Sequence, residues 1–322
     1  MTQTAPFLQV TRALLDESKP FPARYLHRFS DLEPADLKSV LEAWPQVSLR
    51  RKLALLEDLE ELAETDTLMS FEVLAPPLLT DPEPGVRAGA IRLLWECDDP
   101  KLVPTYLHIL NADESAQTRS AAATALGLFI YEGELEEISS DILHQVEENL
   151  LKAARKAKTT LVRRRALEAL GASSRQEVPA LIEAAYHRKE SEWIVSALFA
   201  MGRSSDNRWE KNVLSKLHHP NDDIRTEAIR AAGELSMASA RLPLLDLLAD
   251  EEDPEMRREI IWALSKIGGE GVRSTLEELL EAESDDEETD FLEEALENLL
   301  FTEDLNQFDL LDYELDDEEG EK

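Results

Sequence analysis

A sequence pattern that recurs about every 32 residues is the feature that most constrains the fold of this chain. In its strongest copies an apolar residue is followed by arginine, and apolar or small residues come four, five and eight positions later. The copies begin at Val86, Thr118, Val162, Trp193, Ile224, Met256 and Glu288. Five of the six steps are 31 or 32 residues, and one is 44. Because this spacing marks one face of a helix, each copy predicts an amphipathic helix.

A second amphipathic stretch precedes most of these helices. Three of these stretches open with an apolar residue and proline, as at Val103-Pro104, and proline is favoured in a first helical turn. Each repeat is therefore predicted to be helix, tight turn, helix. The 44-residue step indicates an insertion, assigned to the acidic segment from Tyr131 to Asp141 and to a longer first helix.

A single helix pair cannot bury its own apolar stripe, so the pairs must stack into a continuous core. The sequence thus predicts an all-α fold, an α-solenoid of about eight antiparallel helix pairs. The expected organisation is an N-terminal cap segment at 1–33, the solenoid at 34–301 and an acidic C-terminal tail at 302–322. The register of the first pairs, within residues 34–79, stays open.

The repeats resemble a known family. The segments DPEPGVRAGA, DDIRTEAIRAAGEL and EDPEMRREIIWALSKIGG, within residues 81–300, are similar to the HEAT-like repeats named after phycobiliprotein lyases. This resemblance implies a solenoid and says little about chemistry. It also implies a ladder between successive repeats, formed by the aspartate of each turn and the arginine that follows the apolar start. The matching pairs are Asp81 with Arg87, Asp113 with Arg119, and Asp253 with Arg257.

Charge and cysteine content bound the function. The chain has 322 residues with 68 acidic and 34 basic side chains, a net charge of -34, which repels nucleic acid and anionic membranes. Residues 277–322 alone hold 22 acids and one lysine. The single cysteine, Cys97, fits a reducing compartment, and no apolar run is long enough to span a membrane. We therefore expect a cytoplasmic protein with no nucleic-acid and no membrane partner.

No catalytic or metal-binding motif is recognised. The sequence lacks a G-x-S-x-G elbow and a phosphate-binding glycine loop, and none of its six histidines precedes a glutamate. The expectation is a protein without catalytic residues, metal or cofactor.

Two aromatic residues stand out on the solvent side of the second helices, six positions after the repeat start. In HEAT arrays this helix lines the concave side, and aromatic and arginine side chains dominate binding hot spots. The predicted partner-binding residues are Arg92, Arg164, Phe199, Arg230, Arg258 and Trp262. The alternative is that the aromatic rings pack against the next repeat and the arginines pair with nearby acids.

A cationic run is the second candidate site. It forms a basic patch of Lys152, Arg155, Lys156, Lys158, Arg163 and Arg165, with Arg164 inside it and no acid between Glu148 and Glu168. The acidic tail also carries apolar residues at helical spacing, such as Leu305, Phe308 and Leu311. The tail is interpreted either as a docking motif, as a cap over the last repeat or as a solubilising segment, and an intramolecular contact with the basic patch is a further possibility.

The leading interpretation is a non-catalytic scaffold or adaptor that binds a partner protein or peptide along the concave face. The alternatives are a chromophore-handling enzyme or accessory subunit of the bilin lyase type, which the family name suggests, and a HEAT-like DNA-repair protein. The acidic body argues against the last of these.

Overall fold

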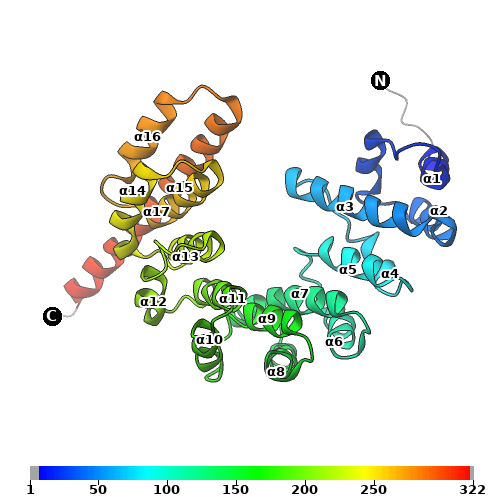
Figure 1. Cartoon of the computed structure of the whole chain (residues 1–322), viewed down its shortest axis with the longest axis horizontal. Helices are drawn as coiled ribbons and strands as arrows, with labels where there is room; N and C mark the ends of the chain where they lie inside the picture. The colour runs from blue at the N-terminus through cyan, green and yellow to red at the C-terminus, as the bar shows by residue number, and fades with distance from the viewer. Residues whose placement is uncertain (1–6, 320–322) are drawn as a thin grey trace. The chain divides into compact units, whose positions relative to one another are not determined.

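The computed structural model of the chain describes residues 7–319, and for residues 305–319 it describes the backbone alone. All regular elements in this part of the chain are helices, and it contains no strand (Figure 1). The predicted all-α class is confirmed.

The helices follow one another as antiparallel pairs. Helix α1 (Phe7–Leu15) comes first, followed by α2 (Pro34–Ala43) and α3 (Leu49–Thr65). Seven pairs follow within the described residues: α4 (Ala75–Leu78) with α5 (Pro84–Arg92), α6 (Val103–Ala112) with α7 (Ala116–Glu134), α8 (Ser140–Lys156) with α9 (Thr160–Ala169), α10 (Val178–Tyr186) with α11 (Ser191–Gly202), α12 (Glu210–Leu214) with α13 (Asp222–Glu234), α14 (Arg241–Asp250) with α15 (Pro254–Ile267), and α16 (Val272–Ala282) with α17 (Asp286–Glu319). Short 3-10 turns supplement them: η1 (Ala23–Phe29), η2 (Trp44–Gln46), η3 (Pro100–Leu102), η4 (Asn207–Trp209) and η5 (Ala238–Ala240). The expected α-solenoid of about eight pairs is confirmed.

The repeat register also agrees with the structure. Each of the seven starts read from the sequence is the third residue of its second helix. At Thr118, Ile224 and Met256 the backbone N–H of this residue is capped by a side chain three positions earlier, at 2.9–3.2 Å. Because such a cap fixes where a helix begins, the repeat start and the helix start coincide.

The 44-residue step is accommodated by longer helices. Helix α7 continues to Glu134 and α8 extends over 17 residues, so part of the expected insertion is helical. At the C-terminus, α17 continues without a break from the last repeat into the acidic tail, through residue 302 to Glu319.

The chain divides into two compact units, residues 1–173 and residues 174–322. In each unit the second helices pack on one another in chain order, α3, α5, α7 and α9 in the first and α11, α13, α15 and α17 in the second. Leu126 in the first unit and Leu264 in the second are fully buried in this layer. The core of each unit is therefore continuous across its repeats, as stacking requires.

A ladder of cations and carboxylates connects successive repeats, as the resemblance implied, but its pairs differ from the three that were matched in the sequence. Arg87 binds the carboxylate of Asp113, in the next turn, through Nε at 2.8 Å and Nη2 at 2.9 Å, and its Nη1 donates to the carbonyl of Asp81 at 2.8 Å. Lys52, the fourth residue of α3 as Arg87 is of α5, likewise contacts Asp81 at 3.2 Å. The cation of one repeat thus binds the carboxylate of the next.

The expected pairs within one repeat do not form between side chains. Arg119 donates to the carbonyl of Asp113 rather than to its carboxylate. Arg257 donates to the carbonyls of Leu248 and Glu251, while Asp253 caps α15. The physical reason is that the aspartate side chain already accepts hydrogen bonds from backbone N–H groups of its turn. The arginine of the same repeat therefore binds the carbonyl groups of that turn instead.

Candidate partner-binding groove

Small residues bring the second helices of the second unit close together. A Cβ atom added at Gly202 would lie 3.1 Å from Cα of Ala231, and one added at Gly233 would lie 2.9 Å from Cα of Ala263. Both distances are below ordinary van der Waals contact, so a side chain at Gly233 would force a shift of the backbone and one at Gly202 would be tightly packed. Longer side chains on the neighbouring helical turns line both sides of the shallow surface between these helices.

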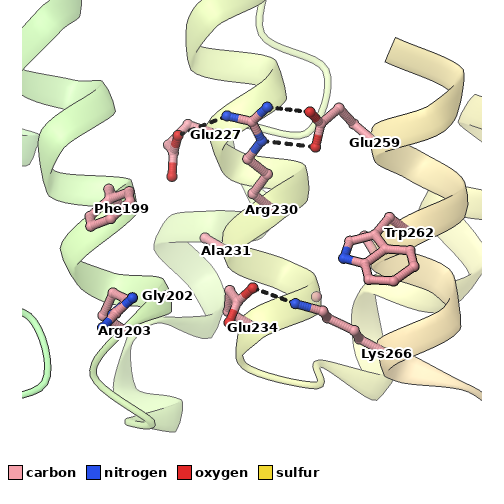
Figure 2. A pocket seen from close by; sticks show the side chains of 12 residues that line it. Phe199, Gly202, Arg203, Glu227, Arg230, Ala231, Glu234, Glu259, Trp262 and Lys266 are labelled. Carbon is pink, nitrogen blue, oxygen red and sulfur yellow. Dashed lines mark hydrogen bonds and ion pairs between the residues drawn. The ribbon is translucent and has the colours of Figure 1, made fainter. Parts of the chain in front are cut away.

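The result is a groove across α11, α13 and α15 with a volume of about 350 Å³. Figure 2 shows Phe199 on α11 and Trp262 on α15 on either side of Arg230, which comes from α13. Phe199 is 39% exposed, Trp262 is half-buried and Arg230 is exposed. Three of the six predicted partner-binding residues therefore line one hollow, each contributed by a successive repeat.

The charged side chains of the groove form ion pairs across neighbouring helices. Arg230 binds the carboxylate of Glu259 through Nη2 and through Nε, which lies 2.8 Å from Oε2, and its Nη1 lies 3.9 Å from Glu227. Lys266 binds Glu234 at 2.6 Å (Figure 2). The hydrogen bonds that Arg230 donates to Glu259 raise the pKa of Arg230 above its ordinary value, so this guanidinium stays charged at any physiological pH.

Trp262 packs next to the last helix, α17. Its ring lies 6.4 Å from that of Phe291 on α17, and the ammonium of Lys266 lies 5.8 Å from the indole. Arg258, also a predicted binding residue, points to the same helix: it binds Glu288 at 2.7 Å and Glu287 at 3.3 Å, and its guanidinium lies 5.2 Å from Phe291. Arg258 is not part of the groove lining.

The other two predicted binding residues belong to the first unit. Nε of Arg92 on α5 contacts both carboxylate oxygens of Glu60 on α3, at 2.6 and 2.8 Å, and Arg164 is half-buried on α9. For Arg92, Arg230 and Arg258, the alternative of pairing with local acids therefore describes the structure, although Arg230 also lines the groove.

The basic patch lies in the first unit at the end of α8 and the start of α9. Lys152, Arg155, Lys156 and Lys158 are exposed, and Arg163 and Arg165 are half-buried. Arg165 binds Glu168 at 2.5 Å, and Lys152 reaches Asn111 at 3.4 Å. Four exposed cations thus remain at the helix junction. The side chains of the tail from residue 305 on lie outside the described part, so its expected contact with this patch does too.

Sequence reasoning missed the partners of the cations. Glu259 is three positions after a repeat start, and Glu234 and Lys266 are ten positions after theirs. These positions differ from positions two and six of the repeat, on which the predicted binding residues were based.

Among the residues that the structure describes, no three His, Cys, Asp or Glu side chains gather in a way that could hold a metal ion. No helix in the described part is both long enough and apolar enough to cross a membrane.

The comparisons with known proteins agree with the repeat assignment. A family model described as HEAT repeats matches residues 71–146 and 210–297. The resemblance expected from the sequence is thereby confirmed.

Individual relatives match over shorter stretches or in fold alone. An epoxyqueuosine reductase of Bacillus cereus is 36% identical over 76 residues, which are 24% of this chain and only 20% of that protein. The complex of CpcE and CpcF of phycocyanin lyase from Nostoc sp. PCC7120 is 19% identical, with 70% of this chain and 94% of that chain covered and a TM-score of 0.46. The X-ray structure of YibA of Escherichia coli is 18% identical, with 88% and 98% covered and a TM-score of 0.44.

Proposed function

The chain belongs to the HEAT-repeat proteins, and from this premise we propose that it is a non-catalytic scaffold that binds a segment of a partner protein in the groove across α11, α13 and α15. The observation that carries the proposal is the gathering of Phe199, Arg230 and Trp262 around one hollow. A stack of helix pairs has no central pocket, so its long surface is where a ligand binds.

The groove has the size to hold an anchoring side chain of a partner protein. A volume of about 350 Å³ accepts one or two side chains of a partner segment and is at the lower end for small-molecule pockets. The rings of Phe199 and Trp262 offer apolar area that loses little conformational entropy on binding. The ion pairs between them, Arg230 with Glu259 and Lys266 with Glu234, offer hydrogen-bonding groups to the backbone of the partner.

The second helices of this unit pack on one another, whereas the first helices contact mainly their own partners. In a curved stack the more closely spaced layer is the inner one, which supports placing the groove on the concave face.

The composition of the groove supports a binding rather than a catalytic role. Its lining contains no serine, histidine or cysteine that could act as a nucleophile, and Arg230 is fixed in its charged form. The proposed location is the cytoplasm, in keeping with the single cysteine.

We also propose that the acidic tail, residues 302–322, binds the basic patch, within one molecule or between two. The opposite charges and the high effective concentration of a tethered segment support this contact. A tail bound in this way competes with any acidic partner of the patch.

Photochemical capture tests the groove. A photoreactive phenylalanine analogue placed at Phe199 should cross-link one partner from native lysate, and the same analogue at Leu242, which is 63% exposed on α14 outside the groove, is the matched control. With the purified partner, Trp262→Ala should weaken binding by about thirtyfold, the effect of losing a hot spot worth about 2 kcal/mol, and Leu242→Ala should leave it unchanged.

Equal cross-linking from both positions, or equal affinity of both variants, would refute the groove as the binding site. Mixing the chain with free bilin tests the chromophore alternative: a shift in visible absorption would replace the scaffold function by pigment handling.

A further inference from the structure

The first unit exposes a tryptophan that the groove of the second unit does not explain. Trp95 lies in the turn after α5 and is 55% exposed, whereas Trp44, Trp193 and Trp209 are 5–6% exposed and Trp262 is half-buried. An exposed indole on a folded protein is uncommon enough to mark an interaction site when its surroundings fit a ligand.

Contacts between α3 and α5 fix what surrounds Trp95. Gly85 faces Leu53, Gly89 faces Leu56, and Arg92 binds Glu60. In these three contacts the residue numbers increase together along both helices and differ by 32 or 33. Helices α3 and α5 are therefore parallel. Trp95 lies three residues beyond the end of α5, and the same offset would bring it level with Leu62 and Ala63, in the last turn of α3.

The loop after α3 adds a second apolar group at this end of the helices. Leu68 is 82% exposed, the highest value among the large apolar side chains of the described residues, and Val73 is 39% exposed. Leu68 and Val73 follow the C-terminal end of α3 and Trp95 follows that of the parallel helix α5; we call these three exposed side chains the Trp95 surface.

Negative charge surrounds the Trp95 surface. Between Lys52 and Lys101 the chain has twelve acidic residues and only two arginines, and both arginines already bind carboxylates, Arg87 that of Asp113 and Arg92 that of Glu60. The nearby carboxylates of Glu61, Glu64, Glu96 and Asp98 are exposed. Partial burial, followed by repulsion from Glu61 and Glu57, raises the pKa of Asp58 above its ordinary value, as expected in a crowded field of like charges.

We propose that the Trp95 surface is a docking site for a lysine- and arginine-rich segment of another protein, with one cation on the indole of Trp95 and an apolar side chain against Leu68. An aromatic face attracts a cation most strongly when the ring is tryptophan, and the carboxylates around it add long-range attraction. The groove of the second unit differs, because its cations and carboxylates already bind one another. The two sites are therefore independent and take partners of different chemistry.

Binding of a labelled peptide tests the proposal with the full chain. The probe is a short fluorescein-labelled peptide that alternates Lys-Lys with Leu, and a peptide with serine in place of lysine is its control. Fluorescence anisotropy should show that Trp95→Ala weakens binding by about threefold to thirtyfold and that Trp95→Phe retains more affinity than Trp95→Ala. Because Trp95 is exposed, thermal melting of both variants should match that of the wild type.

A charge-matched pair of variants separates a site from general attraction to an acidic protein. Glu64→Gln with Glu96→Gln removes one exposed charge at the end of α3 and one next to Trp95 in the chain, and Glu293→Gln with Glu297→Gln removes two exposed charges on α17. The first pair should weaken peptide binding by several-fold more than the second.

Equal effects of the two pairs, or wild-type affinity of Trp95→Ala, would overturn the proposal and leave nonspecific charge attraction. Sedimentation that shows self-association of the wild type and its loss in Trp95→Ala would overturn it in favour of a second copy as the occupant.

Discussion

Replacing Gly233 by alanine tests whether close helix crossings build the groove. Gly233 is the penultimate residue of α13, and an added methyl group would lie 2.9 Å from Cα and 3.1 Å from Cβ of Ala263. The obstacle is backbone, so no side-chain rotation relieves it. Helix α15 cannot move away freely, because α17 packs on it from the other side.

The expected cost follows from two opposing effects. Overpacking of this kind costs about 1–3 kcal/mol, and the better helix propensity of alanine returns at most about 1 kcal/mol, less near a helix end. We expect Gly233→Ala to lower the free energy of unfolding by about 1–2 kcal/mol. Because the groove floor shifts, affinity for the groove's partner should fall as well.

Gly85→Ala is the matched control. Gly85 is also one residue from a helix end, but its added methyl group would meet only the terminal Cδ2 of Leu53, at 2.9 Å, and this group can rotate. Its stability should change by no more than about 0.5 kcal/mol. Urea unfolding followed by circular dichroism measures both variants, and hydrogen exchange should rise in α13 and α15 for Gly233→Ala alone. Equal stability of the two variants would refute the argument that the crossing is sterically closed.

Three further predictions concern the core, the ladder and the tail. Leu264 is fully buried, so Leu264→Ala should cost about 2–5 kcal/mol in urea unfolding, and an unchanged midpoint would show that its site is not packed. Burial alone would raise the pKa of Asp113, but hydrogen bonds from Arg87 and from the N–H of Ser115 hold this pKa below its ordinary value of 3.8. The stabilisation that the Asp113 carboxylate provides is therefore complete above that pH and is lost as pH falls through the folded-state pKa. The stability difference between wild type and Asp113→Asn should accordingly shrink in acid, and a difference independent of pH would contradict the linkage. Deleting residues 302–322 should speed hydrogen exchange at residues 152–165 in low salt and not in high salt, since the Debye length falls from about 10 Å at 0.1 M to 3 Å at 1 M; identical exchange in all conditions would exclude the tail contact.

The fold was predictable because the determinant is local and repeated. The spacing of apolar residues within each copy gives the buried face of the helix, and the turn residues give the helix start. The register of the seven second helices, from α5 to α17, therefore agrees with the sequence to the residue. The register upstream of Val86 was not predictable, because Arg51 and Lys52 occupy the start position where the strongest copies have an apolar residue and arginine.

The site was predictable in part for the same reason. Phe199, Arg230 and Trp262 are each six positions after a repeat start, and their helices α11, α13 and α15 pack on one another and are nearly equal in length, so equivalent positions fall side by side. Their role in binding stays a prediction, and Arg92 and Arg164 do not join them, because they belong to the other unit.

What the sequence determined by itself is the period, the helix pairs and the row of equivalent positions, all of which depend on residues within one repeat. Only the tertiary structure decided which carboxylate each cation binds. Arg92 binds Glu60, 32 residues before it, whereas Arg258 binds Glu288, 30 residues after it. Both neighbours of a repeat offer acids at similar sequence distance, so the choice depends on the crossing of packed helices, which small residues such as Gly233 and Ala263 set.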